Sequence, residues 1–183
     1  MNYCQIIDCD VANGPGLRVS LFVSGCTHHC PGCFNEVAWD KAYGKPWTPE
    51  DTQRLLKMLD RPYIQGLTLL GGEPMELYNQ DSVWDIIKAV REKFPDKDIW
   101  LYSGYTFEQL TGKIPCLDAD ENSRCRGPHT DEILSGLNVL VDGPFILDEK
   151  DITLKFRGSH NQRVLYMTAS LHEEAPVWME EYK

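Results

Sequence analysis

The chain has 183 residues, of which 42% are hydrophobic and 25% are charged, a balance typical of an ordinary folded domain. Its length predicts a single domain over residues 1–183 with its own hydrophobic core. Lys and Arg number 18, whereas Asp and Glu number 28, so the net charge is −10. This acidity argues against binding to nucleic acid or to an anionic membrane surface. No signal peptide opens the chain and no apolar run could cross a bilayer, so we expect a cytoplasmic protein.

The first predicted element is a buried strand at residues 17–23, indicated by a run of Leu, Val and Phe. Residues 1–16 are mixed in character and end in the turn-forming sequence Asn13–Gly16. Cys4 and Cys9 lie in this stretch. We interpret them as small, largely apolar side chains, with a metal-ligand role as the alternative.

Three cysteines follow this strand directly: Cys26, Cys30 and Cys33, with the spacing C-x3-C-x2-C. Glycine and proline around them exclude a regular helix or strand, so the loop can turn its thiols toward one small object. Iron–sulfur clusters are held by cysteine thiolates, and a four-iron cluster usually takes four. A loop with three cysteines would leave one iron open, and an open position is what distinguishes a catalytic metal site from a structural one.

A zinc site is the alternative interpretation of the same loop. Zinc would need a fourth ligand, which His28, His29, Cys4 or Cys9 could supply, although loop histidines more often face solvent or bond the backbone. Phe34, directly after the third cysteine, could shield a cluster from water or could simply pack. Disulfides are less favoured, because nothing marks the chain as secreted; the seven cysteines instead indicate metal or redox use in a reducing compartment.

A helix is predicted to begin at Thr48, which offers a capping hydroxyl before Pro49 and two acidic residues. A short apolar strand follows at residues 66–70 and ends in Gly71-Gly72-Glu73-Pro74. Two glycines would let a ligand approach the backbone closely, and Glu73 presents a carboxylate that suits a positively charged amino group. An ordinary turn is the alternative.

The next two elements are an amphipathic helix at residues 81–94 and a strand at residues 98–102. Ser103 and Gly104 follow this strand. A small hydroxyl beside a glycine suits contact with a ribose or a carboxylate. The alternative is a loop and helix cap that lead into a helix after Thr106.

The last part of the chain contains a polar stretch, residues 112–135, with Cys116 and Cys125, for which free thiols are the default interpretation. Two further apolar strands are predicted, at residues 137–141 and 164–168. Asp142 follows the first of them and could bind a ligand or a cation, or could be a turn-forming aspartate. Trp178 and Tyr182 in the tail are expected to pack on the body of the domain, with a partner contact as the alternative.

Strands and helices alternate along the chain, which indicates parallel strands with helices outside. Every chemically notable group follows a strand, namely the residues at 26–33, 71–73, 103–104 and 142. In βα barrels, sites gather at the carboxyl ends of the strands, so these groups are expected to share one site. A closed eight-fold barrel usually needs about 250 residues. We therefore predict an α/β fold with five or six strands in an incomplete, open βα barrel.

The cysteine spacing and its flanks resemble the radical S-adenosylmethionine (SAM) superfamily, in which this loop binds a [4Fe-4S] cluster and SAM chelates the fourth iron. Three segments further resemble the activating proteins of anaerobic ribonucleoside-triphosphate reductase: Asn13-Gly14-Pro15-Gly16-Leu17-Arg18, Leu21-Phe22-Val23-Ser24-Gly25-Cys26 and Cys30-Pro31-Gly32-Cys33-Phe34-Asn35. The resemblance extends over most of the chain in register, except for about residues 112–135.

This resemblance implies a barrel of the radical SAM type and a site for each cofactor. It implies that Cys26, Cys30 and Cys33 hold the [4Fe-4S] cluster. The Gly71-Gly72-Glu73 segment would contact the SAM amino group. The remaining residues expected to bind the cofactors are Phe34, Ser103, Gly104 and Asp142.

The resemblance also implies an oxidoreductase reaction. SAM would be cleaved reductively to methionine and a 5′-deoxyadenosyl radical, which takes a hydrogen atom from a glycine of the anaerobic ribonucleotide reductase and leaves a glycyl radical there. The expected partners are the large subunit of that reductase and an electron donor such as flavodoxin. Two alternatives stay open: an activase of another glycyl-radical enzyme such as pyruvate formate-lyase, and a zinc-stabilised interaction module without enzymatic activity.

Overall fold

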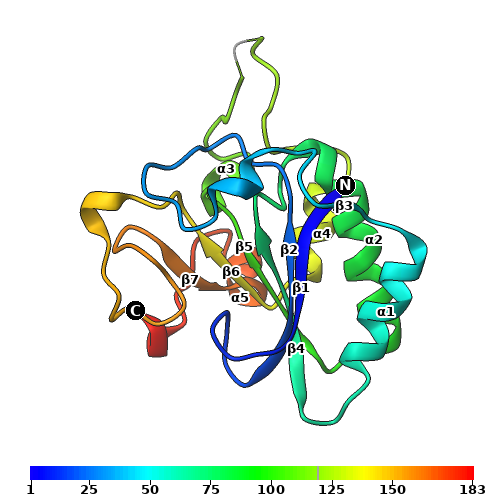
Figure 1. The fold of residues 1–183 in the computed structure, drawn as a ribbon. Helices are drawn as coiled ribbons and strands as arrows, with labels where there is room; N and C mark the ends of the chain where they lie inside the picture. Colours follow the sequence, from blue (N-terminus) through cyan, green and yellow to red (C-terminus); the bar gives the residue numbers. More distant parts are fainter. Residues whose placement is uncertain (119) are drawn as a thin grey trace.

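One sheet of seven strands runs through the computed structural model, which describes residues 1–118 and 120–183 (Figure 1). The order across the sheet is β3-β1-β2-β4-β5-β6-β7. The strands are β1 (Asn2–Asp10), β2 (Leu17–Val23), β3 (Lys45–Pro46), β4 (Ile64–Gly71), β5 (Asp98–Tyr102), β6 (Val139–Asp142) and β7 (Arg163–Tyr166). The sheet is open as predicted, because no pairing within the described residues joins its edges, β3 and β7. Its assignment to the radical SAM barrel type stays a prediction.

The four central strands, β2, β4, β5 and β6, are parallel, as the alternation of elements predicted. The three outer strands are antiparallel to their neighbours, so the prediction of five or six strands, all parallel, was wrong at both edges. β1 returns into β2 through a loop of only six residues, 11–16, and such a short connection is possible only between antiparallel strands. Only the three-residue 3₁₀ helix η2 (Leu147–Glu149) lies between β6 and β7, which is too short to carry the chain across to a parallel position.

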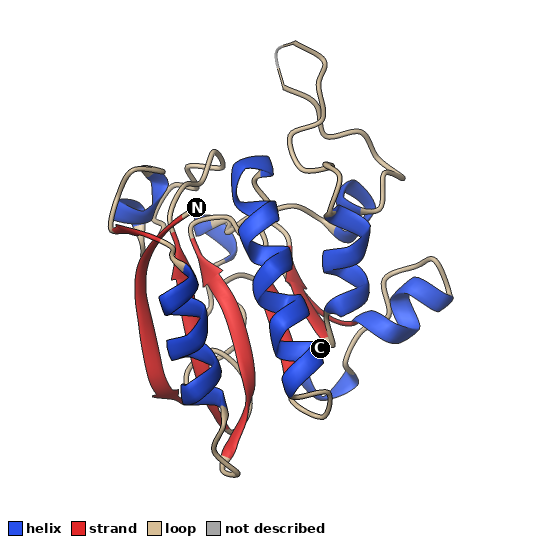
Figure 2. Cartoon of the chain, turned by 90° about the vertical axis from the view of Figure 1, so that its right-hand side faces the viewer, coloured by secondary structure: helices blue, strands red, loops and turns tan. Residues whose placement is uncertain are grey.

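The larger helices cover one face of the sheet. Helices α1 (Pro49–Leu59), α2 (Leu77–Lys93) and α4 (Thr130–Gly136) lie to the right of the strands in Figure 1 and in front of them in Figure 2. The other helices are α3 (Phe107–Leu110), α5 (Met167–His172) and the short 3₁₀ segments η1 (Glu36–Trp39), η2 (Leu147–Glu149) and η3 (Glu180–Tyr182). The predicted start of α1 is confirmed, because Thr48 Oγ1 accepts a hydrogen bond from the Asp51 N–H in a capping box.

Three helical features differ from the prediction. Helix α2 begins at Leu77, four residues early, because its polar first turn points inward; Asn79 and Gln80 are buried there. Strand β7 ends at Tyr166, and the residues predicted to extend it begin helix α5. Helix α4 lies within the polar stretch 112–135, where no helix was predicted, and it buries only two apolar side chains against the core.

The core has two parts of unequal size. The larger part lies where the sheet meets helices α1, α2 and α4. The smaller part consists of Trp100, Val139, Val141 and Val164, and Phe156 and Tyr182 pack against it edge to face. Tyr182 therefore packs on the body of the domain, as predicted for the tail. Within the described residues, no helix has the length and apolar character needed to cross a membrane.

Candidate cofactor site

The predicted functional segments meet at one end of the sheet. Since β2, β4 and β5 are parallel neighbours, the loops that leave their carboxyl ends lie side by side. A cavity of about 420 Å³ opens at this end, within the range of ligand pockets. Nine of the ten predicted site residues line it: Cys26, Cys30, Cys33, Phe34, Gly71, Gly72, Glu73, Ser103 and Gly104.

The cysteine loop and the Gly71-Gly72-Glu73 segment are bonded together through their backbones. The Gly72 N–H donates to Val23 O at 2.8 Å and the Glu73 N–H donates to Gly25 O at 2.8 Å. A Cβ atom on Gly72 would lie 2.5 Å from the Gly25 carbonyl oxygen, which is too close. Glycine at this position therefore lets two loops of the protein pack together. From the sequence, the two glycines were predicted only to let a ligand come close to the backbone.

Glu73 is the polar centre of the site. Its carboxylate is buried, with 1% exposure, and four donors surround it. Oε1 accepts from the Met75 N–H and the Ser103 hydroxyl, both at 2.9 Å. Oε2 accepts from the Gly104 N–H at 2.7 Å and lies 3.0 Å from His28 Nε2. One carboxylate thus joins the cysteine loop to the ends of β4 and β5.

His28 is a member of the site that sequence reasoning placed elsewhere. Its ring was expected to face solvent, bond the backbone or hold a metal, but it packs edge to face on Tyr105 with centroids 4.3 Å apart and donates to Glu73. A Cβ atom on Gly104 would lie 2.6 Å from His28 Nε2, so glycine there makes room for the ring. The two partners are 45 residues apart, and no local pattern signals such a contact.

Burial makes loss of the proton harder for two of the three thiols, those of Cys26 and Cys30. Burial, and then the negative charge of Glu73, raise the pKa of the Cys26 thiol to about 12. Burial also raises the pKa of Cys30. Backbone N–H groups work in the opposite direction, and the N–H of Asn35 donates to Cys33 Sγ at 3.4 Å. A thiolate ligand must lose its proton, and such N–H donors stabilise the charge on sulfur.

The start of the cysteine loop is anchored by residues that the sequence interpretation missed. Thr27 donates its N–H and its hydroxyl to Glu76 Oε1, at 2.9 and 2.6 Å. Arg124 Nη2 donates to Thr27 Oγ1 at 2.5 Å. Asn79 Nδ2 donates to the carbonyl oxygens of Ser24 and Glu73. These polar contacts, which range from buried to exposed, hold the loop before any cofactor is bound.

A single metal ion finds no ready ligand set in this part of the chain. Among residues 1–118 and 120–183, no three His, Cys, Asp or Glu side chains are gathered closely enough to hold one ion. The three cysteines instead line the wall of a cavity. Zinc needs its ligand atoms at about 2.0–2.3 Å from one point, whereas a cluster of several iron and sulfur atoms fills a larger space.

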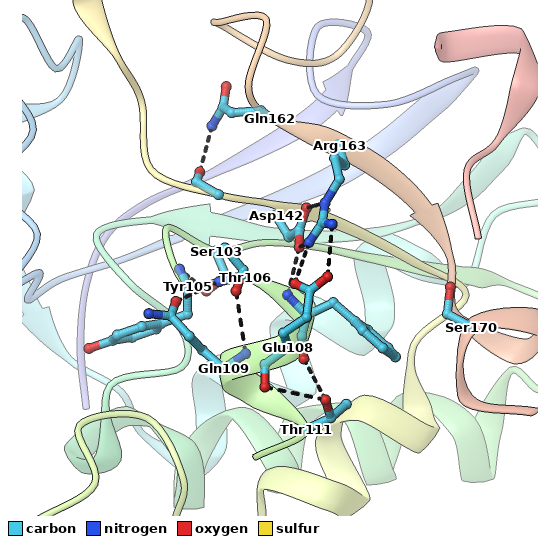
Figure 3. A network of polar contacts seen from close by, with 12 residues as sticks. Ser103, Tyr105, Thr106, Glu108, Gln109, Thr111, Asp142, Gln162, Arg163 and Ser170 are labelled. Carbon is cyan, nitrogen blue, oxygen red and sulfur yellow. Dashed lines mark hydrogen bonds and ion pairs between the residues drawn. The ribbon is translucent and has the colours of Figure 1, made fainter. Parts of the chain in front are cut away.

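Asp142 is the one predicted site residue that does not line the cavity. Its carboxylate is fully buried and forms an ion pair with Arg163, with Nη2 2.5 Å from Oδ2. It also accepts from the Phe107 N–H at 2.6 Å, while Arg163 pairs in addition with Glu108 (Figure 3). These contacts join β6 and β7 to the start of α3 and give Asp142 a structural role.

A further part of the cavity wall comes from the loop between β6 and β7. Lining residues from this loop include Phe145, Ile152, Phe156 and Arg157. Arg157 Nε is buried and has no hydrogen-bond partner among the described residues. Phe34 and Ile152 are 84% and 89% exposed, so the rim of the cavity presents apolar surface to its surroundings. The sequence resembled the family at Phe156-Arg157-Gly158-Ser159 but was interpreted only as a polar turn, since the apolar residues of the loop follow no regular period and did not indicate a cavity wall.

Comparison with known proteins identifies the family of the chain. A family described as a 4Fe-4S single cluster domain matches residues 12–165. The anaerobic ribonucleoside-triphosphate reductase-activating protein of Enterobacteria phage T4 is 39% identical over 166 residues, covering 90% of this chain and 93% of its own. The proteins of the same name from Vibrio cholerae serotype O1 and Escherichia coli K12 are 40% and 36% identical, covering 88% and 91% of this chain and 96% and 99% of theirs. The chain therefore belongs to the family of anaerobic ribonucleoside-triphosphate reductase-activating proteins and contains its 4Fe-4S single cluster domain.

Proposed function

We propose that this protein activates an anaerobic ribonucleoside-triphosphate reductase by radical SAM chemistry, with Cys26, Cys30 and Cys33 holding a [4Fe-4S] cluster. The names of the relatives support the target, and the matched 4Fe-4S domain includes the cysteine loop. The observation that carries the proposal is the sharing of one cavity by three thiols and a buried carboxylate. The whole of residues 1–183 would act as one domain in the cytoplasm.

The residues around the cavity fit both cofactors. Three thiols from one loop would leave the fourth iron to SAM. Glu73 supplies a negative charge for the SAM amino group. Arg157 lines the same cavity and supplies a positive charge there, which suits a carboxylate group of the cosubstrate. A site that offers charges of both signs is what an amino acid cosubstrate requires.

Bound together, the cluster and SAM would supply the chemistry: reductive cleavage to methionine and a 5′-deoxyadenosyl radical, which takes a hydrogen atom from a glycine of the reductase. The protein itself would bind, orient and shield these groups. Glu76, Thr27 and Asn79 would hold the cysteine loop in place. Gly71 and Gly72 would fix the distance between that loop and Glu73.

Contact between Glu73 and the SAM amino group would require one of its present donors to leave. A carboxylate offers about four acceptor positions, and four donors already occupy them. Two of these donors are backbone N–H groups, and the Ser103 hydroxyl is buried. His28 is the remaining donor and lies on the cysteine loop. We therefore expect its ring to turn away from Glu73 when SAM binds.

The position of the cavity supports a protein substrate. It opens at a rim with exposed Phe34 and Ile152, and exposed apolar side chains around a site mark a surface that a partner covers. A glycine carried on a loop of the large reductase subunit could enter there. A one-electron donor such as flavodoxin would reduce the cluster between turnovers.

The proposal is tested by anaerobic reconstitution. The protein should take up about four irons per chain, release 5′-deoxyadenosine from SAM with dithionite, and give the large reductase subunit a glycyl radical signal in electron paramagnetic resonance (EPR). Cys30→Ala should lose all three properties. Cys9→Ala, at an exposed cysteine outside the cavity, is the control and should retain them. Full activity of Cys30→Ala would refute the proposal, and a radical signal on pyruvate formate-lyase alone would transfer it to another activase.

A further inference from the structure

Two cysteines outside the cofactor site lie against each other at the base of a hairpin. The hairpin projects from the body near the cysteine loop, at the top of Figures 1 and 2. Its arms are joined by an antiparallel bridge between Leu117 and Ser123. The Arg124 N–H donates to Cys116 O at 2.8 Å, so Cys116 on one arm lies beside Arg124 and Cys125 on the other.

The spacing permits a covalent link between these thiols. Hydrogen-bonded antiparallel residues have Cα atoms about 5.5 Å apart, and one further step of about 3.3 Å gives roughly 6.4 Å between Cys116 and Cys125. Disulfides form at Cα separations up to roughly 7 Å. The chain bends at Arg124 and Cys125, so the alternation of a straight strand does not force the side chains to opposite faces. Burial, followed by the neighbouring Cys116 thiol, raises the pKa of Cys125.

The two cysteines differ in access and in anchoring. Cys125 is buried in the core, and its carbonyl oxygen accepts hydrogen bonds from Gln80 Nε2 at 2.7 Å and Thr130 Oγ1 at 3.2 Å. Cys116 is partly exposed. A small oxidant can therefore reach Cys116 first, and the Cys125 thiol is held beside it by the hydrogen bonds to its backbone.

The hairpin is connected to the cofactor site through the residue next to Cys125. Arg124 donates to Thr27 Oγ1 at 2.5 Å and lies over the ring of Tyr105, with Cζ 5.8 Å from the centroid. Thr27 stands between Cys26 and the remaining cysteines of the loop. A bond that fixes the base of the hairpin would therefore also fix Arg124 against the cysteine loop.

We propose that Cys116 and Cys125 form a reversible intrachain disulfide that fastens the hairpin and Arg124 to the cysteine loop. In reaction with a small-molecule disulfide, the Cys116 thiolate attacks one sulfur, forms a mixed disulfide and releases one thiolate. The Cys125 thiolate then attacks the Cys116 sulfur and releases the second thiolate. The protein loses two electrons and two protons, and the oxidant becomes two thiols. A dithiol reductant reverses both steps.

The test uses the cluster-loaded protein under anaerobic conditions with glutathione disulfide as the oxidant. After denaturation in a thiol-blocking reagent and digestion with trypsin, Cys116 and Cys125 fall in separate peptides, residues 114–124 and 125–126. A linked pair of these peptides, two hydrogen atoms lighter than their sum and absent after dithiothreitol, is expected. Slower amide hydrogen exchange of the segment around Thr27 in the oxidised protein is expected as well.

Matched variants make the result decisive. Cys116→Ser should lose the linked pair and the slowed exchange, whereas Cys9→Ser, at an exposed cysteine elsewhere, should keep both. If glutathione modifies Cys9 fully while Cys116 and Cys125 stay unlinked, the proposal is overturned. A disulfide that forms without slower exchange near Thr27 would overturn the connection to the cysteine loop. The proposal does not depend on the proposed reaction, because neither readout requires SAM or the reductase.

Discussion

Replacement of Glu73 by glutamine should destabilise the protein even when no cluster and no SAM are present. The carboxylate accepts from two backbone N–H groups, one on each oxygen, those of Met75 and Gly104. A glutamine amide must place its NH₂ group on one of these two sides. The Ser103 hydroxyl or the His28 ring can turn and accept from it, but the N–H of Met75 or Gly104 is then left without an acceptor.

The expected loss of stability follows from the one backbone N–H group that Glu73→Gln leaves without an acceptor. An unsatisfied buried N–H group costs about 1–3 kcal/mol, and hydrogen bonds to a charged acceptor exceed neutral ones by roughly 1 kcal/mol. We therefore expect Glu73→Gln to lose about 3 kcal/mol of unfolding free energy, which lowers Tm by roughly 6–12 °C for a domain of this size.

The Tm difference between Glu73→Gln and the wild type is measured on cluster-free protein by thermal unfolding monitored with circular dichroism. The control is Glu92→Gln, which makes the same chemical change at an exposed position on α2 and should leave Tm unchanged within about 1–2 °C. If Glu73→Gln melts with the wild type, the carboxylate does not join the three segments in the way that its contacts indicate, and its role would be confined to ligand binding.

Three further predictions concern neighbouring residues. Gly72→Ala would place a Cβ 2.5 Å from Gly25 O, so we expect a loss of about 1–3 kcal/mol and reduced iron uptake in reconstitution; full iron content at unchanged Tm would contradict the packing argument. Arg163→Met would leave the buried Asp142 carboxylate without its cation, at a cost of about 3–5 kcal/mol. Burial already raises the pKa of Asp142, and the substitution would raise it further, so the folded variant would bind a proton on Asp142 more tightly than the unfolded chain does. The Tm difference between the variant and the wild type should therefore shrink as the pH falls toward 4. A Tm difference that does not depend on pH would argue against this. Phe34→Ser, at a side chain 84% exposed, should change stability by no more than about 0.5 kcal/mol yet weaken radical transfer to the reductase, and undiminished transfer would remove Phe34 from the partner surface.

The parts of the fold that could be predicted are those with local signals. The central strands are mostly apolar and lack a regular alternation, because strands buried on both faces need none. Thr48 and Pro49 mark the start of α1 by capping chemistry alone. The cysteines, Glu73, Ser103 and Gly104 were placed together because each follows a parallel strand, and the carboxyl ends of such strands meet.

The parts that were missed depend on contacts between distant residues. Strand β1 lies near an edge and its burial is irregular, so its sequence shows neither a buried run nor a clean alternation. The contact of His28 with Glu73 spans 45 residues, and that of Arg124 with Thr27 spans 97. Asp142 was predicted to follow a strand but is the last residue of β6, and its ion pair with Arg163 arises only once β7 returns beside β6.

The central claim is that the cysteine loop holds a four-iron cluster by three thiolates and leaves one iron to SAM. The EPR spectrum of the reduced, reconstituted protein, recorded before and after addition of SAM, tests it most directly. The account predicts that SAM changes the cluster signal, because its amino and carboxylate groups would become ligands of the open iron. A signal that stays the same at saturating SAM would mean that a side chain of the protein already holds the fourth iron, and would contradict the account.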